Sequence, residues 1–141
     1  KGYSMKCQIF ADENKNKNRD DYTHLNVNDI EVQDIPNHSI DEILIGDTLS
    51  YLEESVAHKV ISYVALKLRK EGKAIFEDTD LDELCKQVVD HRNSEIFNAT
   101  IKDKKTILPC NTVMQSLRKN NLSIISTVLE DTNYIIVATK I

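Results

Sequence analysis

Apolar and polar residues occur in blocks along the chain, and the spacing within the apolar blocks switches between strand and helix periods. Residues 6–11 and 40–45 each hold a short apolar run, which predicts two strands, the second of them covered on both faces. From Leu52 to Leu68 an apolar residue recurs every four positions. This spacing predicts an amphipathic helix over residues 50–70.

Two signals for helix ends frame this stretch. Ser50 and Glu53 have the spacing of a capping box, in which side chains satisfy the first backbone amides of a helix. Gly72 is placed as the residue that ends the helix just beyond its last turn. The ten polar residues 12–21 contain no apolar anchor, so they are expected to form a solvated loop.

The remaining segments repeat the same two patterns. Apolar positions at helical spacing predict helices over 80–91 and 111–120, whereas 92–109 is expected to be irregular, with a short extended piece at 96–101. Only Asp131 and Thr132 separate the last two apolar runs, which are therefore expected to form an antiparallel hairpin. The other predicted strands are 22–27, 30–34, 73–77, 122–130 and 133–140.

Strands that alternate with helices predict an α/β fold with a doubly wound, mostly parallel sheet and an antiparallel C-terminal hairpin. The length of 141 residues suits one domain. Residues 1–5 are expected to be an expression remnant or a disordered start, and 6–141 the single domain. No apolar run approaches the roughly 18 residues that a membrane span needs, so no membrane association is expected.

Charge argues against nucleic acid as a partner. Eighteen basic and twenty-three acidic side chains give a net charge of −5, which repels phosphate backbones unless a local basic patch exists. The one dense patch contains Lys102, Lys104 and Lys105, and such a run is expected to be a solvated loop.

The three cysteines, Cys7, Cys85 and Cys110, lie far apart and form no paired motif. They are expected to be small core residues in a reducing compartment, which favours a cytoplasmic location. The histidines lack the spacing of metal ligands, so no metal site is expected. Asp80 and Glu83 are expected to cap the helix at 80–91 rather than to begin a calcium loop.

Two stretches carry a resemblance to a known family. Residues 34–53, D-I-P-N-H-S-I-D-E-I-L-I-G-D-T-L-S-Y-L-E, resemble the central segment of class I S-adenosylmethionine (SAM)-dependent methyltransferases. Residues 68–84, L-R-K-E-G-K-A-I-F-E-D-T-D-L-D-E-L, are similar to the turn, fifth strand and helix that follow in that family. The likeness extends over about 6–141 and implies a Rossmann-like methyltransferase sheet.

The resemblance also implies a cofactor turn after the first strand, and there the sequence departs from the family. Glycines normally let the backbone approach the cofactor closely at this turn. The matching segment begins Ala11-Asp12 and contains no glycine, although Asn14 can adopt the left-handed backbone of a tight turn. Asp12 would place a negative charge near the cofactor carboxylate.

The other implied cofactor contacts are acidic or amide residues at later strand ends. The position that grips the ribose is held by Asn28, with Asp29 next to it. Asp34 matches the acidic residue near the adenine, and its alternative role is that of a turn residue before a proline. Asp47 lies where family members place catalytic or substrate-facing groups, or else it prepares the cap of the following helix. No catalytic residue is identified.

Three functions agree with these observations. The favoured one is a methyltransferase-like domain with a degenerate cofactor site that lacks efficient catalysis. It would be a binding or structural module of a larger assembly, of which a viral assembly is one form, with a protein partner or a second copy of itself. The alternative is an active small SAM-dependent methyltransferase. The third is a regulatory domain that binds another nucleotide or metabolite at the same crevice.

Overall fold

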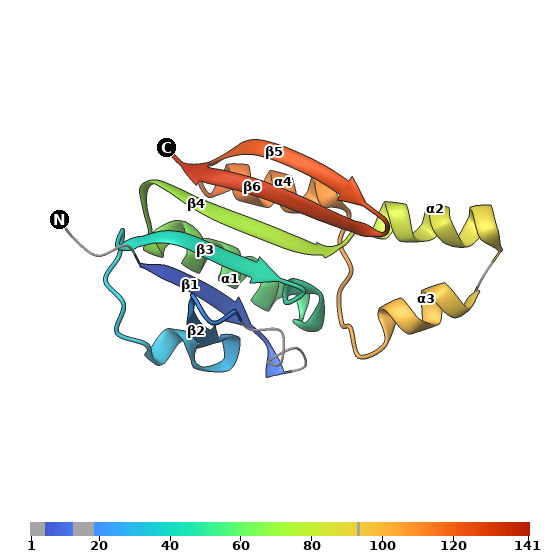
Figure 1. Ribbon diagram of the computed structural model, residues 1–141, viewed down its shortest axis with the longest axis horizontal. Helices are drawn as coiled ribbons and strands as arrows, with labels where there is room; N and C mark the ends of the chain where they lie inside the picture. The colour runs from blue at the N-terminus through green and yellow to red at the C-terminus, as the bar shows by residue number, and fades with distance from the viewer. Residues whose placement is uncertain (1–4, 13–18, 93) are drawn as a thin grey trace.

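The computed structural model describes residues 5–12, 19–92 and 94–141 (Figure 1). Within these residues, six strands form one mixed sheet, with helices packed against it. The expected remnant at 1–5, apart from Met5, and most of the expected loop at 12–21 lie outside the described residues. The strands are β1 Lys6–Phe10, β2 Thr23–Asn26, β3 Ile40–Gly46, β4 Leu68–Thr79, β5 Leu122–Glu130 and β6 Asn133–Lys140. The helices are α1 Glu54–Lys67, α2 Leu81–His91, α3 Ser94–Ile101 and α4 Cys110–Lys119, together with the 3-10 turns η2 Val27–Val32 and η3 Leu49–Tyr51.

The strand order confirms the predicted doubly wound α/β sheet. The order is β2-β1-β3-β4-β6-β5, so the chain builds outward from β1 and β3 in both directions. The pairs among β1, β2, β3 and β4 are parallel, whereas β6 pairs antiparallel with both β4 and β5. The last pair is the predicted hairpin, with both strands at their expected positions.

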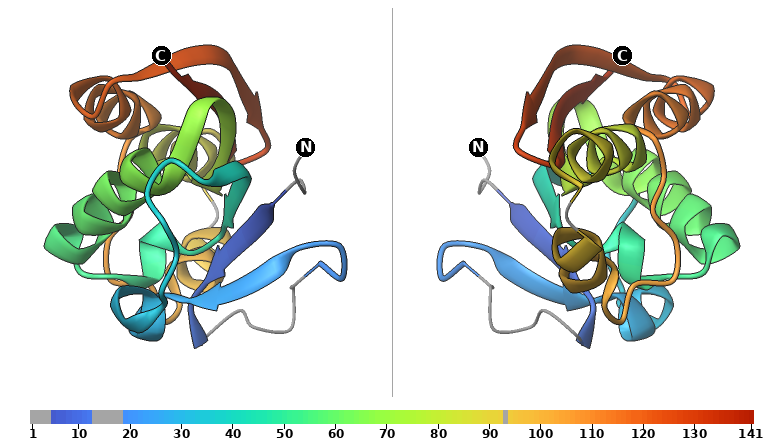
Figure 2. Two further views of the ribbon diagram at one scale, coloured as in Figure 1. Left: turned by 90° about the vertical axis from the view of Figure 1, so that its left-hand side faces the viewer. Right: turned by 90° about the vertical axis from the view of Figure 1, so that its right-hand side faces the viewer.

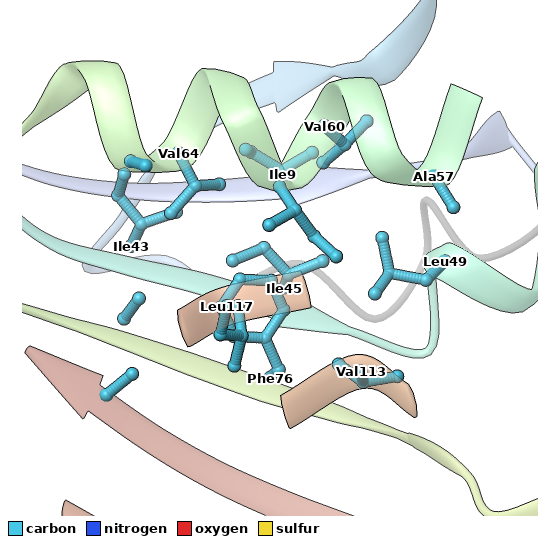
Figure 3. Packing of buried hydrophobic residues seen from close by; sticks show 14 of the residues in the cluster. Ile9, Ile43, Ile45, Leu49, Ala57, Val60, Val64, Phe76, Val113 and Leu117 are labelled. Carbon is cyan, nitrogen blue, oxygen red and sulfur yellow. The ribbon is translucent and has the colours of Figure 1, made fainter. Parts of the chain in front are cut away.

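One apolar core lies between the sheet and the two helices α1 and α4, which lie on the same side of it (Figure 2). Side chains from β1, β3 and β4 point into it, with Ile9, Ile45 and Phe76 near its centre (Figure 3). Val64 of α1 and Leu117 of α4 close it from the helical side. The period-four apolar pattern of α1 is therefore a core face, as expected for a helix that packs on a sheet.

Two of the expected elements are wrong in type. The strand expected at 30–34 belongs to η2, where Val27 and Ile30 are buried and Val32 is exposed. Burial at i and i+3 suits a 3-10 turn, and the Asn26 side chain caps it by accepting from the Asn28 amide.

The extended piece expected at 96–101 is also wrong, because these residues belong to α3. Ile96, Phe97, Thr100 and Ile101 are the half-buried positions of this helix, and their spacing follows the helical period. The helix lacks fully buried side chains among its described residues, so its apolar signal is weak.

The helix expected at 50–70 is shorter than its pattern predicted. It begins at Glu54, after Glu53 as a cap residue without a side-chain hydrogen bond, so the capping box at Ser50 is wrong. It ends at Lys67, and β4 begins directly at Leu68, because Leu68 pairs with Ile40 of β3. Sheet pairing has taken over the last turn that the apolar pattern assigned to the helix.

The expectation that Gly72 ends the helix is wrong, because Gly72 lies inside β4 and does not have a left-handed backbone. Glu71 instead has a φ of 65°. The need for glycine at 72 is steric: a Cβ there would lie 2.8 Å from the Arg69 carbonyl oxygen and 2.9 Å from Leu68 Cδ1. The expected role of Gly72 at a helix end is therefore wrong, and the glycine is required by crowding inside β4.

Candidate functional site

A cavity of about 480 Å³ lies at the carboxyl ends of β3 and β4, next to α3. Open α/β sheets bind their ligands outside the carboxyl ends of their strands. Asp47, Glu77 and Asp78 make one wall acidic, and Arg19 and Lys104 also line the cavity. Three carboxylates and two cationic side chains therefore line the cavity.

Asp47 is positioned by a backbone turn at the end of β3. Its φ of 50° lies in the left-handed region, which aspartate tolerates better than most residues. Its amide donates to the carbonyl of Glu77 at 2.7 Å, which holds the turn against β4. The chain thus leaves the sheet where the Asp47 side chain lines the cavity.

Lys104 joins the walls of this cavity. Its ammonium donates to Thr79 Oγ1 at 2.7 Å and lies 3.3 Å from Asp47 Oδ1 and 3.7 Å from Asp78 Oδ1. The same nitrogen lies 5.6 Å from the centroid of the Tyr51 ring, which is within cation–π range. Only 8% of the Lys104 side chain is exposed. The ammonium thus fastens the segment after α3 onto the ends of β3 and β4.

Asp78 is the buried partner in this cluster, with 3% of its side chain exposed. Its Oδ2 accepts from the Ser50 amide at 3.1 Å, and its Oδ1 accepts from the Thr79 amide at 2.7 Å. Burial raises the pKa of the Asp78 carboxyl, while the charge of Lys104 and these hydrogen bonds oppose the rise. Asp78 therefore depends on Lys104 for its counter-charge.

The expectation that the lysine patch is a solvated loop is wrong for Lys104, although Lys102 and Lys105 are exposed. A signal for the buried lysine existed in β4 rather than in the patch. Asp78 follows Ala74 and Phe76 at the spacing of one sheet face, which places a carboxylate in line with core residues. A buried carboxylate needs a cation or hydrogen-bond donors.

Asp12, expected in the cofactor turn, is tied to the end of β2. Its Oδ1 accepts from Asn26 Nδ2 at 2.7 Å, and its Oδ2 accepts from Asn28 Nδ2 at 3.1 Å. Ala11, directly before it, is buried, and Asp29 is exposed on η2. The structure thus brings Asp12 and Asn28 together, but around a carboxylate rather than a glycine turn.

Asp34 lies near the amino end of β3, at the opposite end of the strand from the cavity. Its neighbour Ile35 accepts through its carbonyl from Lys67 Nζ at 2.6 Å, and Ser39 donates to the Lys67 carbonyl at 2.9 Å. Lys67 ends α1 beside the start of β3, whereas the cavity lies where β3 ends. Asp34 and Asp47 therefore do not share one cavity.

Of the predicted cofactor residues that the structure describes, Asp47 alone lines the cavity. Asn14 lies outside the described residues.

Asp80 has the capping role that the sequence predicted. Its Oδ2 accepts from the Glu83 amide at 3.2 Å at the start of α2, and its Oδ1 accepts from the Cys110 amide at 2.7 Å at the start of α4. Within the described part of the chain, no group of three or more histidine, cysteine or acidic residues could hold a metal ion. The described helices include none long and apolar enough to cross a bilayer.

Comparisons with known proteins find similarity in structure alone. Neither a family model nor a curated protein sequence matches the chain. A SAM-dependent methyltransferase of Thermotoga maritima, described as a candidate histamine N-methyltransferase, has a TM-score of 0.65 at 12% identity, covering 99% of this chain and 83% of that one. A chain from the Haloferax volcanii complex between the Trm112 methyltransferase activator and a proposed methyltransferase has a TM-score of 0.64 at 10% identity, covering 96% and 82%.

A third similar structure contains the cofactor. It is a geranyl diphosphate methyltransferase in complex with SAM, with a TM-score of 0.55 at 10% identity, and the match covers 85% of this chain and 57% of that one. At these identities the likeness concerns the fold.

Proposed function

We propose that this chain, which has a class I methyltransferase-like fold, is a binding module without efficient methyl transfer that acts within a larger assembly. One observation carries the proposal. The residues that match the family's cofactor contacts are divided between the two ends of the strands, because Asp34 lies beside the start of β3, whereas Asp12 and Asp47 follow the carboxyl ends of β1 and β3. Such a fold keeps the sheet that can bind a partner, whereas cofactor-dependent catalysis needs its contacts in one place, and the fold alone does not provide them.

The turn after β1 argues in the same direction. A cofactor carboxylate at this turn would meet the Asp12 carboxylate, and like charges at close range repel each other. Asn26 and Asn28 already donate to Asp12, so they would have to give up these hydrogen bonds to bind a ribose. We infer that the residues present do not fit SAM in the manner of the family.

A protein partner is the better-supported ligand. The Haloferax volcanii structure pairs an activator protein with a proposed methyltransferase, which is a precedent for a chain of similar fold in a protein complex. A viral assembly and a cytoplasmic location stay predictions from the sequence.

The proposal is tested by isothermal titration calorimetry of SAM and S-adenosylhomocysteine into the full chain. We expect no saturable heat up to about 1 mM ligand, which corresponds to a binding free energy weaker than about −4 kcal/mol. The same sample must show cooperative thermal unfolding by circular dichroism, so that a negative result comes from folded protein.

Saturable binding at micromolar ligand would refute the proposal and support the active methyltransferase. Asp34→Ala and Asp47→Ala would then locate the ligand, because these residues lie near opposite ends of β3. A loss of binding in Asp47→Ala alone would assign the ligand to the cavity.

A further inference from the structure

The edge strand β5 is unusually exposed for its length. It forms the end of the sheet beyond β6 (Figure 1). Of the eight residues after Leu122, seven are exposed and Ile124 is half-buried. Its large apolar side chains include Ile125, Val128 and Leu129, which are 60%, 52% and 53% exposed. Val128 and Leu129 are consecutive, so they point to opposite faces of the sheet.

Most of the devices that protect edge strands are missing from β5. Natural edges carry lysine, proline or inward-pointing charges, or are very short, because a free strand edge pairs readily with another chain. The sequence LSIISTVLE contains no proline or lysine, and Glu130 is its one charged residue. A bulge falls between Ile124 and Ser126, but from Ser126 to Glu130 the pairing with β6 is regular.

Charge is distributed unequally between the two ends of β5. The exposed Arg118 and Lys119 lie just before the strand, at the end of α4. Glu130 and Asp131, both exposed, lie at its other end. The strand thus runs from a basic end to an acidic end, with uncharged residues between them.

We propose that β5 pairs with β5 of a second copy of this chain, antiparallel and about a two-fold axis, so that the sheet continues across a dimer. Antiparallel pairing brings the acidic end of each strand toward the basic end of its partner, and the two-fold axis repeats this contact. Parallel pairing would align the two Glu130–Asp131 ends. The inference names the partner left open by the proposed function and does not depend on whether SAM binds.

Sedimentation equilibrium of the full chain, up to about 100 µM, tests the pairing. We expect a dimer whose dissociation constant rises at least about tenfold in Val128→Lys and in Leu129→Lys, because a lysine on the edge opposes strand addition. Val89→Lys is the matched control: Val89 is 72% exposed, but it lies on α2, and this variant is expected to dimerise like the wild type. A wild type that stays monomeric, including one that instead binds a different chain, would overturn the proposal. So would a dimer that both β5 variants leave unchanged.

Charge reversal tests the direction of the strands. Glu130→Lys and Lys119→Glu are each expected to weaken the dimer, and the double variant K119E/E130K is expected to restore it, because the opposite charges then face each other again. If each single change leaves the dimer as tight as before, the antiparallel arrangement is wrong. The calorimetry of SAM reads a different property, so failure of one proposal is distinguishable from failure of the other.

Discussion

Lys104→Met removes the ammonium of the cavity cluster while keeping a long unbranched side chain. We expect it to lower the free energy of unfolding by about 3 kcal/mol, because removing one partner of a buried ion pair costs about 3–5 kcal/mol. The lower end applies because Asp78 keeps its hydrogen bonds from the Ser50 and Thr79 amides. Asp47, with 29% of its side chain exposed, is partly solvated and adds little to the loss.

The loss should depend on pH in a defined direction. Burial already raises the pKa of Asp78 above its ordinary value of 3.8, and Lys104 opposes this shift. Without Lys104 the pKa rises further, so the folded state binds the proton more tightly than the unfolded state does. The deficit is therefore largest above the folded pKa and shrinks as the pH falls toward 3.8.

Urea unfolding followed by circular dichroism, at neutral and at mildly acidic pH, measures this deficit. A loss of about 3 kcal/mol corresponds to a fall of roughly 10 °C in the melting temperature of a domain of this size. Lys102→Met is the matched control, since Lys102 is exposed on the same segment and its change should stay within about 0.5 kcal/mol.

A double-mutant cycle with Asp78→Asn isolates the pair. Asp78→Asn is itself destabilising, because asparagine has one acceptor oxygen for two backbone donors. The informative quantity is the coupling, which we expect to be at least about 1 kcal/mol. If Lys104→Met costs the same in the Asp78→Asn background as in the wild type, the ion pair does not stabilise the fold, and the reasoning is refuted.

Two further predictions concern the core. Gly72→Ala is expected to lower the free energy of unfolding by about 1–3 kcal/mol through overpacking. Gly46→Ala should be close to neutral, because no atom lies within 4 Å of the added Cβ. Urea unfolding compares the two variants, and equal costs would contradict the steric role of Gly72. The expectation that the cysteines are core residues is wrong for Cys85, which is exposed. Burial raises the pKa of Cys7 and Cys110 to about 11, so a thiol reagent at pH 8 should modify Cys85 at once and the other two only on unfolding. Rapid reaction of more than one thiol in the native protein would show that this burial is wrong.

Local patterns in the sequence were sufficient for the main elements of the fold. The apolar periods at 6–11, 40–45 and 122–140 predicted β1, β3 and the terminal hairpin, because each depends on residues close together in the chain. The strand–helix alternation then led to the doubly wound sheet, since connection rules leave few other arrangements. Two errors were errors of type, at 30–34 and 96–101, where the apolar signal is weak. Others lay at boundaries such as the end of α1, where pairing between β3 and β4 outweighed helix propensity.

The composition of the cavity was decided by the tertiary structure. Asp47, Asp78 and Lys104 are separated by up to 57 positions, and they meet because parallel strands end at one edge and the segment after α3 returns there. In the same fold Asp34 lies near the opposite end of β3 from Asp47, although the resemblance had grouped the two residues. The sequence alone determined most of the segments that are strands and helices, because those preferences are local. Only the folded chain decided which charges meet, because an ion pair depends on distance in space and on the water that packing removes.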